Sequence, residues 1–167
     1  NNIYKATNFK IPVKFENENT QTEKLLVVGQ TELTKTAGIS APTKTYGARG
    51  FVIKNINGNV YILGGNTQGT LYGVYEFLHH QFGYEPYSID EIALETGVTD
   101  KKLLAFNVSD IPDIPYIQGV HEYYRYYNAE AGHRMRFNTY NEIFIGSDQP
   151  WHNVFSYLPK NVYQKEH

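Results

Sequence analysis

Residues 50–83, GFVIKNINGNVYILGGNTQGTLYGVYEFLHHQFG, decide the fold of this chain. The first half of this stretch contains two short runs rich in β-branched and aromatic residues, at 51–54 and 60–63. Between them lies Asn57-Gly58, and an Asn-Gly pair readily adopts the positive φ angles of a tight turn. The first half therefore predicts a β-hairpin.

The second half of the stretch predicts one amphipathic helix. The pair Gly64-Gly65 ends the second strand, after which Asn66 or Thr67 can cap the first N–H groups of a helix. Gly83 stands where a left-handed C-terminal cap belongs. The residues expected to form one apolar stripe at helical spacing are Leu71, Val74, Tyr75, Leu78 and Phe82.

Two glycines, Gly69 and Gly73, remove side chains on or near this helix and would let another backbone approach it closely. The whole stretch is thus interpreted as a helix laid on an antiparallel sheet.

Further strands are predicted on both sides of this unit. Residues 9–15 (FKIPVKF) alternate as a strand whose proline indicates an edge position or a bulge. Residues 24–29 (KLLVVG) are typical of a buried strand, and two more strands are expected around 91–94 and at 101–107. Residues 30–49 are expected to be a loop with, at most, a short turn of helix.

Two prolines mark a change of character at residues 110–115 (DIPDIP). Each proline biases the residue before it away from helix, so the segment predicts an extended connector and a domain boundary. Beyond it, residues 116–127 are interpreted as a strand that leads into a loop. A helix is expected at 129–138 and a strand at 142–145.

Composition limits the classes of function. The formal charge of −2 and the pI near 6.3 give no electrostatic reason to expect nucleic acid or a membrane as partner. The absence of cysteine excludes disulfides and thiolate metal sites. Tyrosine is unusually frequent, with 15 copies, and its ring packs well while keeping a hydroxyl for solvent or ligand.

The order of LLVVGQ, the hairpin, NTQGTLYGVYEFLHHQFG and SDIPDIPY resembles a small N-terminal α/β domain that precedes the barrel in several glycoside hydrolases. These are the α-glucuronidases, the family 20 β-hexosaminidases and a related uncharacterised family of gut bacteria. The resemblance covers residues 9–110 and continues loosely into 134–138 and 151–155. The helix is similar to a G-T-x-x-x-V-Y-x-F-L run through Gly69, Thr70, Val74, Tyr75, Phe77 and Leu78.

The resemblance implies two regions. Residues 1–110 would be the N-terminal α/β domain, like domain 2 of β-hexosaminidases, and 111–167 the connector and first segment of a truncated (β/α) barrel. The expected fold class is α+β, sandwich-like: a mostly antiparallel mixed sheet with one long helix on one face, followed by an incomplete β/α segment. A complete barrel needs about 250 residues, so the chain is expected to be a fragment. The helix that usually precedes the strand at 9–15 is expected to be missing.

The implied function is that of a non-catalytic N-terminal domain in a glycoside hydrolase acting in polysaccharide degradation, which supports the catalytic barrel. The catalytic carboxylates of such families lie downstream, so no catalytic residue, cofactor or metal is assigned here. The expected partners are carbohydrate, through the parent enzyme, and the chain's own catalytic domain. An exported, periplasmic or cell-surface bacterial location is implied. The alternative is a carbohydrate-binding or adhesion module with an aromatic-rich surface.

Five residues are candidates for substrate binding. His121, Glu122 and Arg125 stand where a first barrel strand would end, the end that hosts active sites, and an arginine there could hold a sugar hydroxyl or a uronate carboxylate. Trp151 and His152 could offer a stacking face and a hydroxyl partner. The more ordinary interpretations are a solvated loop with a structural ion pair, and a buried tryptophan beside a satisfied histidine.

Two further motifs have ordinary structural explanations. The glycine-rich residues 64–69 lack the spacing of a phosphate loop, so a strand-to-helix turn explains them. His79 and His80 are adjacent on the predicted helix and therefore point in different directions, which predicts surface histidines and not a metal pair.

Overall fold

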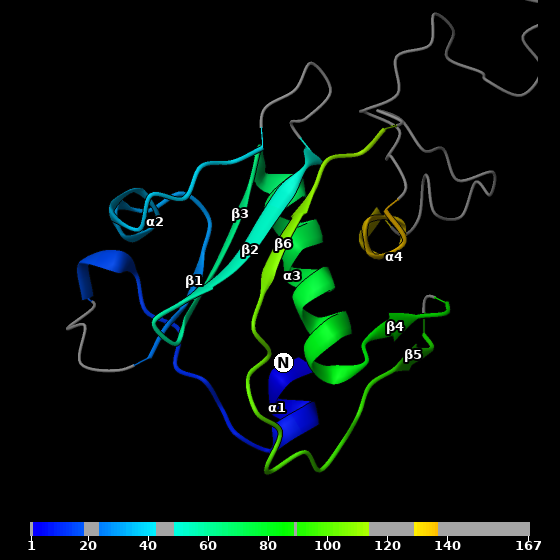
Figure 1. Ribbon diagram of the computed structural model, residues 1–167. Helices are drawn as coiled ribbons and strands as arrows, with labels where there is room; N and C mark the ends of the chain where they lie inside the picture. The colour runs from blue at the N-terminus through cyan, green and yellow to red at the C-terminus, as the bar shows by residue number, and fades with distance from the viewer. Residues whose placement is uncertain (1, 19–23, 43–48, 89, 114–128, 137–167) are drawn as a thin grey trace, which may run out of the picture.

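The computed structural model describes residues 2–18, 24–42, 49–88, 90–113 and 129–136. Figure 1 shows one long helix, α3, lying along a twisted sheet. In chain order the elements are α1 (Asn2–Thr7), the 3₁₀ turn η1 (Glu16–Glu18), β1 (Leu26–Val28), α2 (Glu32–Thr36), β2 (Phe51–Ile56), β3 (Asn59–Gly64), α3 (Thr67–Phe82), β4 (Glu85–Pro86), β5 (Ile92–Ala93), β6 (Asn107–Asp110) and α4 (Ala129–Arg134).

The main sheet is mixed and has the strand order β1-β3-β2-β6. Strand β1 runs parallel to β3, whereas β2 is antiparallel to both β3 and β6. A separate two-stranded sheet joins β4 and β5. With α3 packed on one face of the main sheet, the predicted α+β class and the mostly antiparallel sheet are confirmed.

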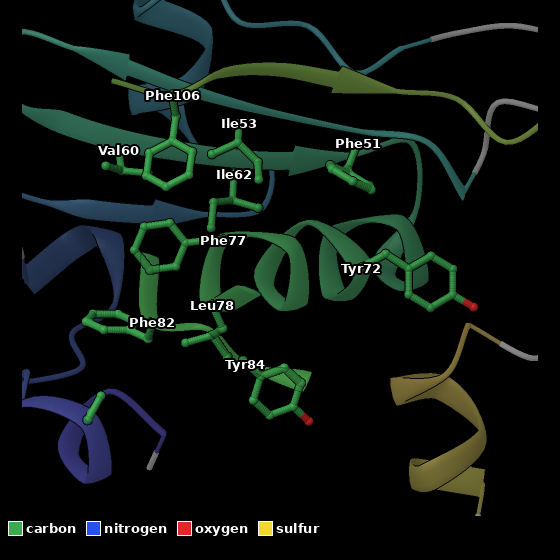
Figure 2. Packing of buried hydrophobic residues seen from close by; sticks show 11 residues of the cluster. Phe51, Ile53, Val60, Ile62, Tyr72, Phe77, Leu78, Phe82, Tyr84 and Phe106 are labelled. Carbon is green, nitrogen blue, oxygen red and sulfur yellow. The ribbon is translucent and has the colours of Figure 1, made fainter. Parts of the chain in front are cut away.

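Both faces of the main sheet are apolar because successive strand residues point to opposite sides. Ile53 and Ile62 face α3 and belong to the larger core, where Figure 2 shows Phe77 of the helix directed toward the sheet. Val52 and Leu63 point to the other face, in a smaller cluster against which residues of α2 and the following segment pack. The sheet is therefore the middle layer of the described part of the chain.

The predicted hairpin is confirmed. In the β2–β3 register Ile56 lies opposite Asn59, which leaves a two-residue turn. Asn57 and Gly58 both have positive φ, at 52° and 82°. A two-residue type I′ turn, whose twist matches that of the flanking strands, requires positive φ at both residues. The side chain of Asn55 accepts a hydrogen bond from Gly58 N–H at 3.2 Å and steadies the turn.

Both predicted ends of the long helix are confirmed. Asn66 is the N-cap, and its side-chain oxygen accepts a hydrogen bond from Gly69 N–H at 2.7 Å. Gly83 is the left-handed C-cap, with φ at 62°, and its N–H donates to the last free carbonyls of the helix. Asparagine and glycine are the residues that such caps favour.

The helix contacts the sheet at Gly73, one of the two glycines predicted to allow a close approach, and Gly64 of β3, which was not predicted, lies against the backbone of Gly69 and Thr70. A Cβ built on Gly73 would lie 2.7 Å from Ile62 Cγ2, and one on Gly64 would lie 2.0 Å from the backbone nitrogen of Thr70. Real Cβ atoms do not come this close to other heavy atoms, so only glycine fits at both positions. The close approach lets the side chain of Phe77 reach the centre of the core.

The predicted apolar stripe of α3 is confirmed only in part. Leu78 and Phe82 are buried, but Leu71, Val74 and Tyr75 are only half-buried. Part of the face against the sheet is made of glycine, which carries no apolar side chain that a periodicity analysis could recognise. The buried residues of the helix are Gly69, Tyr72, Gly73, Phe77, Leu78, Gln81 and Phe82.

Three predicted strands differ from the structure. Residues 9–15 are extended but belong to no described strand, and Val13 is 96% exposed; Pro12 gives this segment one donor fewer for a ladder. Within residues 24–29 the strand is shorter, because β1 covers Leu26–Val28. It is also an edge strand, with β3 as its one neighbour among the described strands, so Val27 is buried while Val28 is 45% exposed.

The third strand is shifted: residues 101–106 are irregular, and β6 begins at Asn107. The cause is the buried side chain of Gln81, which accepts a hydrogen bond from Leu104 N–H at 3.0 Å and donates to Lys102 C=O at 3.2 Å. These backbone groups are thus satisfied by α3 instead of a neighbouring strand.

Several smaller predictions can also be compared with the structure. The helical turn within residues 30–49 is α2, which begins with a capping box between Thr31 and Thr34. The strand around 91–94 is the short β5, and the helix at 129–138 is α4, which ends at Arg134. The expectation that no helix precedes residues 9–15 is wrong, because α1 lies there and buries Ala6 completely.

The predicted strands at 116–127 and 142–145 lie outside the described residues. The domain boundary at 110–115 stays a prediction. Within the described ranges, no helix combines the length and the apolar character that crossing a membrane requires.

Candidate functional site

All five residues predicted to bind substrate lie outside the described part of the chain. These are His121, Glu122, Arg125, Trp151 and His152. Their roles stay predictions, and the site has to be built from other residues.

In the described residues, charged and aromatic side chains gather where α4 lies beside the C-terminal half of α3. A cavity of about 470 Å³ opens there. Figure 1 shows the positions of α3, α4 and β4, the elements beside it. Its walls are formed by Tyr75, Glu76, His79, Tyr84, Glu85, Pro86, Arg134, Met135 and Arg136.

Arg136, two residues past the end of α4, contacts three elements that precede the proline connector. Its guanidinium pairs with Glu76 of α3 and lies 3.6 Å from the carboxylate of Asp110, the last residue of β6. It also lies 5.7 Å from the ring centre of Phe51 at the start of β2, within cation–π distance. Arg136 has φ at 61°, in the left-handed region that few side chains adopt.

The two histidines of α3 lie next to different carboxylates. His79 Nδ1 is 2.8 Å from a carboxylate oxygen of Glu85, and His80 Nε2 is 3.0 Å from Glu76. Both are exposed, as predicted. Within the described ranges, no three histidine or carboxylate side chains gather as a metal site would require.

Two tyrosines form the apolar side of the cavity. The rings of Tyr75 and Tyr84 are stacked, with centroids 5.7 Å apart and planes 7° from parallel. Burial raises the pKa of both hydroxyls, and the positive charge of Arg134 opposes this only in part. Both phenols are therefore neutral at physiological pH and can donate hydrogen bonds.

The ion pairs of this cluster are mostly local, and one residue, Arg136, joins distant segments. Glu76 is engaged by Arg136 and His80, Glu85 by His79, and Glu130 of α4 by Arg134. Partly exposed pairs of this kind each contribute at most about 1 kcal/mol. Of these pairs, only that between Glu76 and Arg136 joins α3 to the segment that contains α4, and Arg136 also lies near Asp110. We infer that the contacts of Arg136 orient this segment more than they stabilise it.

The glycine-rich turn before α3 uses its own N–H groups. Gly64 N–H donates to Thr70 Oγ1 at 3.0 Å, and Gly65 N–H donates to Gly50 C=O at 3.0 Å. Gly69 N–H donates to the side chain of Asn66, so all three of these N–H groups already have acceptors within the protein. The turn thus has the strand-to-helix role that its sequence predicts.

Sequence reasoning missed the cluster at α3 and α4. One signal was present, because Glu76 and His80 are four residues apart and so share a helix face. The partner Arg136 is 60 residues away in sequence from Glu76, and no local pattern links the two.

The chain matches one family model, the glycosyl hydrolase family 67 N-terminus, over residues 5–77. The matched span runs from α1 to the middle of α3 and so contains the hairpin and the glycine contact with the sheet. No curated protein and no solved structure matches the chain. The predicted resemblance to the N-terminal domain of α-glucuronidases is confirmed over this span, while the resemblances to β-hexosaminidases and the gut-bacterial family stay predictions.

Proposed function

We propose that this chain provides the non-catalytic N-terminal domain of a glycoside hydrolase, α-glucuronidase-like, that acts in polysaccharide degradation. Its role is to pack against a catalytic (β/α) barrel and to hold the barrel in place. The observation that carries this proposal is the match of residues 5–77 to the glycosyl hydrolase family 67 N-terminus.

The contact between α3 and α4 supports the packing role. Helix α4 follows the proline connector in sequence, yet Arg136 just beyond it pairs with Glu76 and Asp110 of the first region. A domain that steadies a downstream region needs a contact of this kind, in which one side chain is held by two elements of the domain at once.

The partners and location of the parent protein follow from the same proposal. Carbohydrate would be bound by the parent enzyme and not by the sheet-and-helix region, and the main partner of this region would be the chain's own catalytic domain. An enzyme that degrades polysaccharide meets its substrate outside the cytoplasm, so we propose a periplasmic or cell-surface location.

The test compares this chain with the parent enzyme on nitrophenyl glycosides and glucuronides. The parent is expected to turn over one of these substrates and the chain alone none. Removal of the region before the connector should lower the thermal midpoint of the parent. Turnover by the chain alone would contradict the proposal, and so would a parent whose stability is independent of this region.

A carbohydrate-binding module is the second candidate. It is favoured by aromatic rings on the surface of the described region, since Tyr87 is 67% and Tyr4 49% exposed. Aromatic rings of this kind can pack against the apolar face of a sugar. This candidate predicts saturable binding of the chain to a polysaccharide that Tyr87→Ala weakens, whereas the scaffold role predicts no binding across a glycan array.

A further inference from the structure

A groove is lined on one side by residues from the 9–16 segment and on another by β1. It has a volume of about 960 Å³, and Phe77 and Phe82 of α3 also contribute to its walls. Of the nine large apolar side chains that are exposed in the described ranges, five line this groove. They are Phe9, Ile11, Phe15, Val28 and Leu103. Such clustering of exposed apolar side chains is typical of a binding surface.

On the β1 side of the groove, some backbone groups have no partner among the residues that the structure describes. In a strand, alternate residues direct their N–H and C=O groups to opposite edges. Leu25 C=O accepts from Val60 N–H, and Gly29 N–H donates to Ile62 C=O, so the odd-numbered residues of this strand face β3. Leu26 and Val28 therefore face the groove, and no described residue bonds to their main-chain groups.

The charges along the groove are mainly positive. Lys14, Lys24 and Lys101 line it, with one carboxylate, Glu16. Lys101 is paired with Glu95, and Lys24 donates to the carbonyl oxygen of Asn57, which has no charge, so the positive charge of the groove comes from Lys14 and Lys24. The Glu16 carboxylate already accepts a hydrogen bond from Leu33 N–H at 3.0 Å. An occupant with negative charge at its edges is therefore favoured.

We propose that this groove binds an extended segment of a partner polypeptide, and that this segment pairs with β1 as an added strand. In the segment, apolar residues alternate with polar ones, and acidic residues lie at its ends. The choice of a peptide follows from the backbone groups of Leu26 and Val28. An extended chain satisfies such groups by β-augmentation, whereas a lipid tail in the same apolar groove would leave them without partners.

This binding surface is independent of the proposed enzymatic role. Helix α4 packs on α3 beside Tyr75 and Glu76, whereas the groove lies at the β1 edge of the sheet. Figure 1 shows β1 and α4 on opposite sides of α3. A partner in the groove would leave the contact with the downstream region unobstructed.

Two kinds of variant separate this proposal from a structural role of the groove. Val28→Pro removes an N–H that faces the groove and none that β3 uses, and proline is tolerated at such edge positions. Lys14→Glu reverses a charge in the groove. Lys10→Glu is the matched control, because Lys10 lies on the same extended segment but does not line the groove.

The experiment selects peptides from a phage-displayed library of random 12-residue sequences on the full chain. Enriched peptides are expected to alternate apolar and polar residues, to carry acidic residues, and to shift the amide NMR signals of Leu26 and Val28. Val28→Pro should weaken their binding at least about tenfold. Lys14→Glu should weaken it about fivefold and Lys10→Glu less than about twofold.

Several results would overturn the proposal. The first is that the selection enriches no peptide. The second is that the NMR signals shift only for residues on the α3–α4 side, and the third is that Val28→Pro binds the peptides as tightly as the unchanged chain does. If sodium decanoate, and no peptide, shifts the groove signals, the site binds amphiphiles. Self-association that Val28→Pro abolishes, seen by sedimentation, would make a second copy the occupant. If circular dichroism shows that Val28→Pro is unfolded, the two lysine variants decide the question.

Discussion

The two faces of α3 make contacts of opposite character. Its inner face lies against the sheet through Gly73 and Phe77, with backbone and apolar side chains in direct contact. Its outer face contacts the segment that contains α4, where Glu76 pairs with Arg136, two residues past the end of that helix. The difference shows that adjacent residues of one helix can have different structural roles. The inner contact holds the fold together, and the outer one orients a neighbouring segment.

The inner contact is broken most strongly by Phe77→Ala. Phe77 is buried and packs at 5.2 Å between ring centroids on Phe106 and at 6.2 Å on Phe82. Loss of a core phenylalanine leaves a cavity and costs about 3–5 kcal/mol. Urea denaturation should therefore show a much lower midpoint with an unchanged slope. A loss below about 1 kcal/mol would mean that the helix does not need this contact.

A somewhat smaller loss is expected for Gly64→Ala. The added methyl would meet the backbone nitrogen of Thr70, which cannot move without the helix, so we expect a loss of about 3 kcal/mol. Gly73→Ala is the matched comparison, because its nearest neighbour is a side-chain methyl of Ile62. Its clash is partly offset by the better helix propensity of alanine. If both variants unfold at the same urea concentration, backbone proximity is not what distinguishes these sites.

A much smaller effect is expected on the outer face. Glu76→Gln removes the carboxylate that Arg136 and His80 share, and the partly exposed pairs are worth at most about 1 kcal/mol. Global stability should hardly change, but trypsin should cleave after Arg134 and Arg136 several times faster. Glu32→Gln, which breaks the exposed pair with Lys35 in α2, is the control and should leave this cleavage unchanged.

The smallest effect concerns alkaline pH. Burial raises the pKa of Tyr75 and Tyr84 in the folded chain. The folded state then binds their protons more tightly than the unfolded state, so stability is full below about pH 10 and falls as the pH rises further. Tyr84→Phe should reduce the loss of stability between pH 9 and pH 11 in urea titrations. An identical loss in the variant would exclude these hydroxyls as its cause.

The hairpin and the long helix could be predicted because their signals are local. Asn57-Gly58 specifies the turn, and Asn66 and Gly83 specify both ends of α3, each through its own backbone preference. The shift of β6 had no such signal, since it depends on one hydrogen bond that Gln81 donates to Lys102 and one that it accepts from Leu104, both more than 20 residues away.

The candidate site could be predicted far less well than the fold. The segment at 9–15 has a strand's alternation of residues, yet no described strand pairs with it, because alternation shows which side chains share a face and not whether a partner exists. The contacts of Arg136 with Glu76 and Asp110 depend on tertiary structure alone. The five predicted substrate residues lie in parts of the chain that the structure does not describe.

The most direct test of the two-faced helix is amide hydrogen exchange on the whole chain at low salt and in 1 M sodium chloride. Salt screens partly exposed ion pairs but not apolar contacts. Amides of β2, β3 and α3 should keep their protection at both salt concentrations, while those of α4 lose theirs in high salt. Equal loss of protection in α3 and α4, or none in either, would contradict the separation of the two faces.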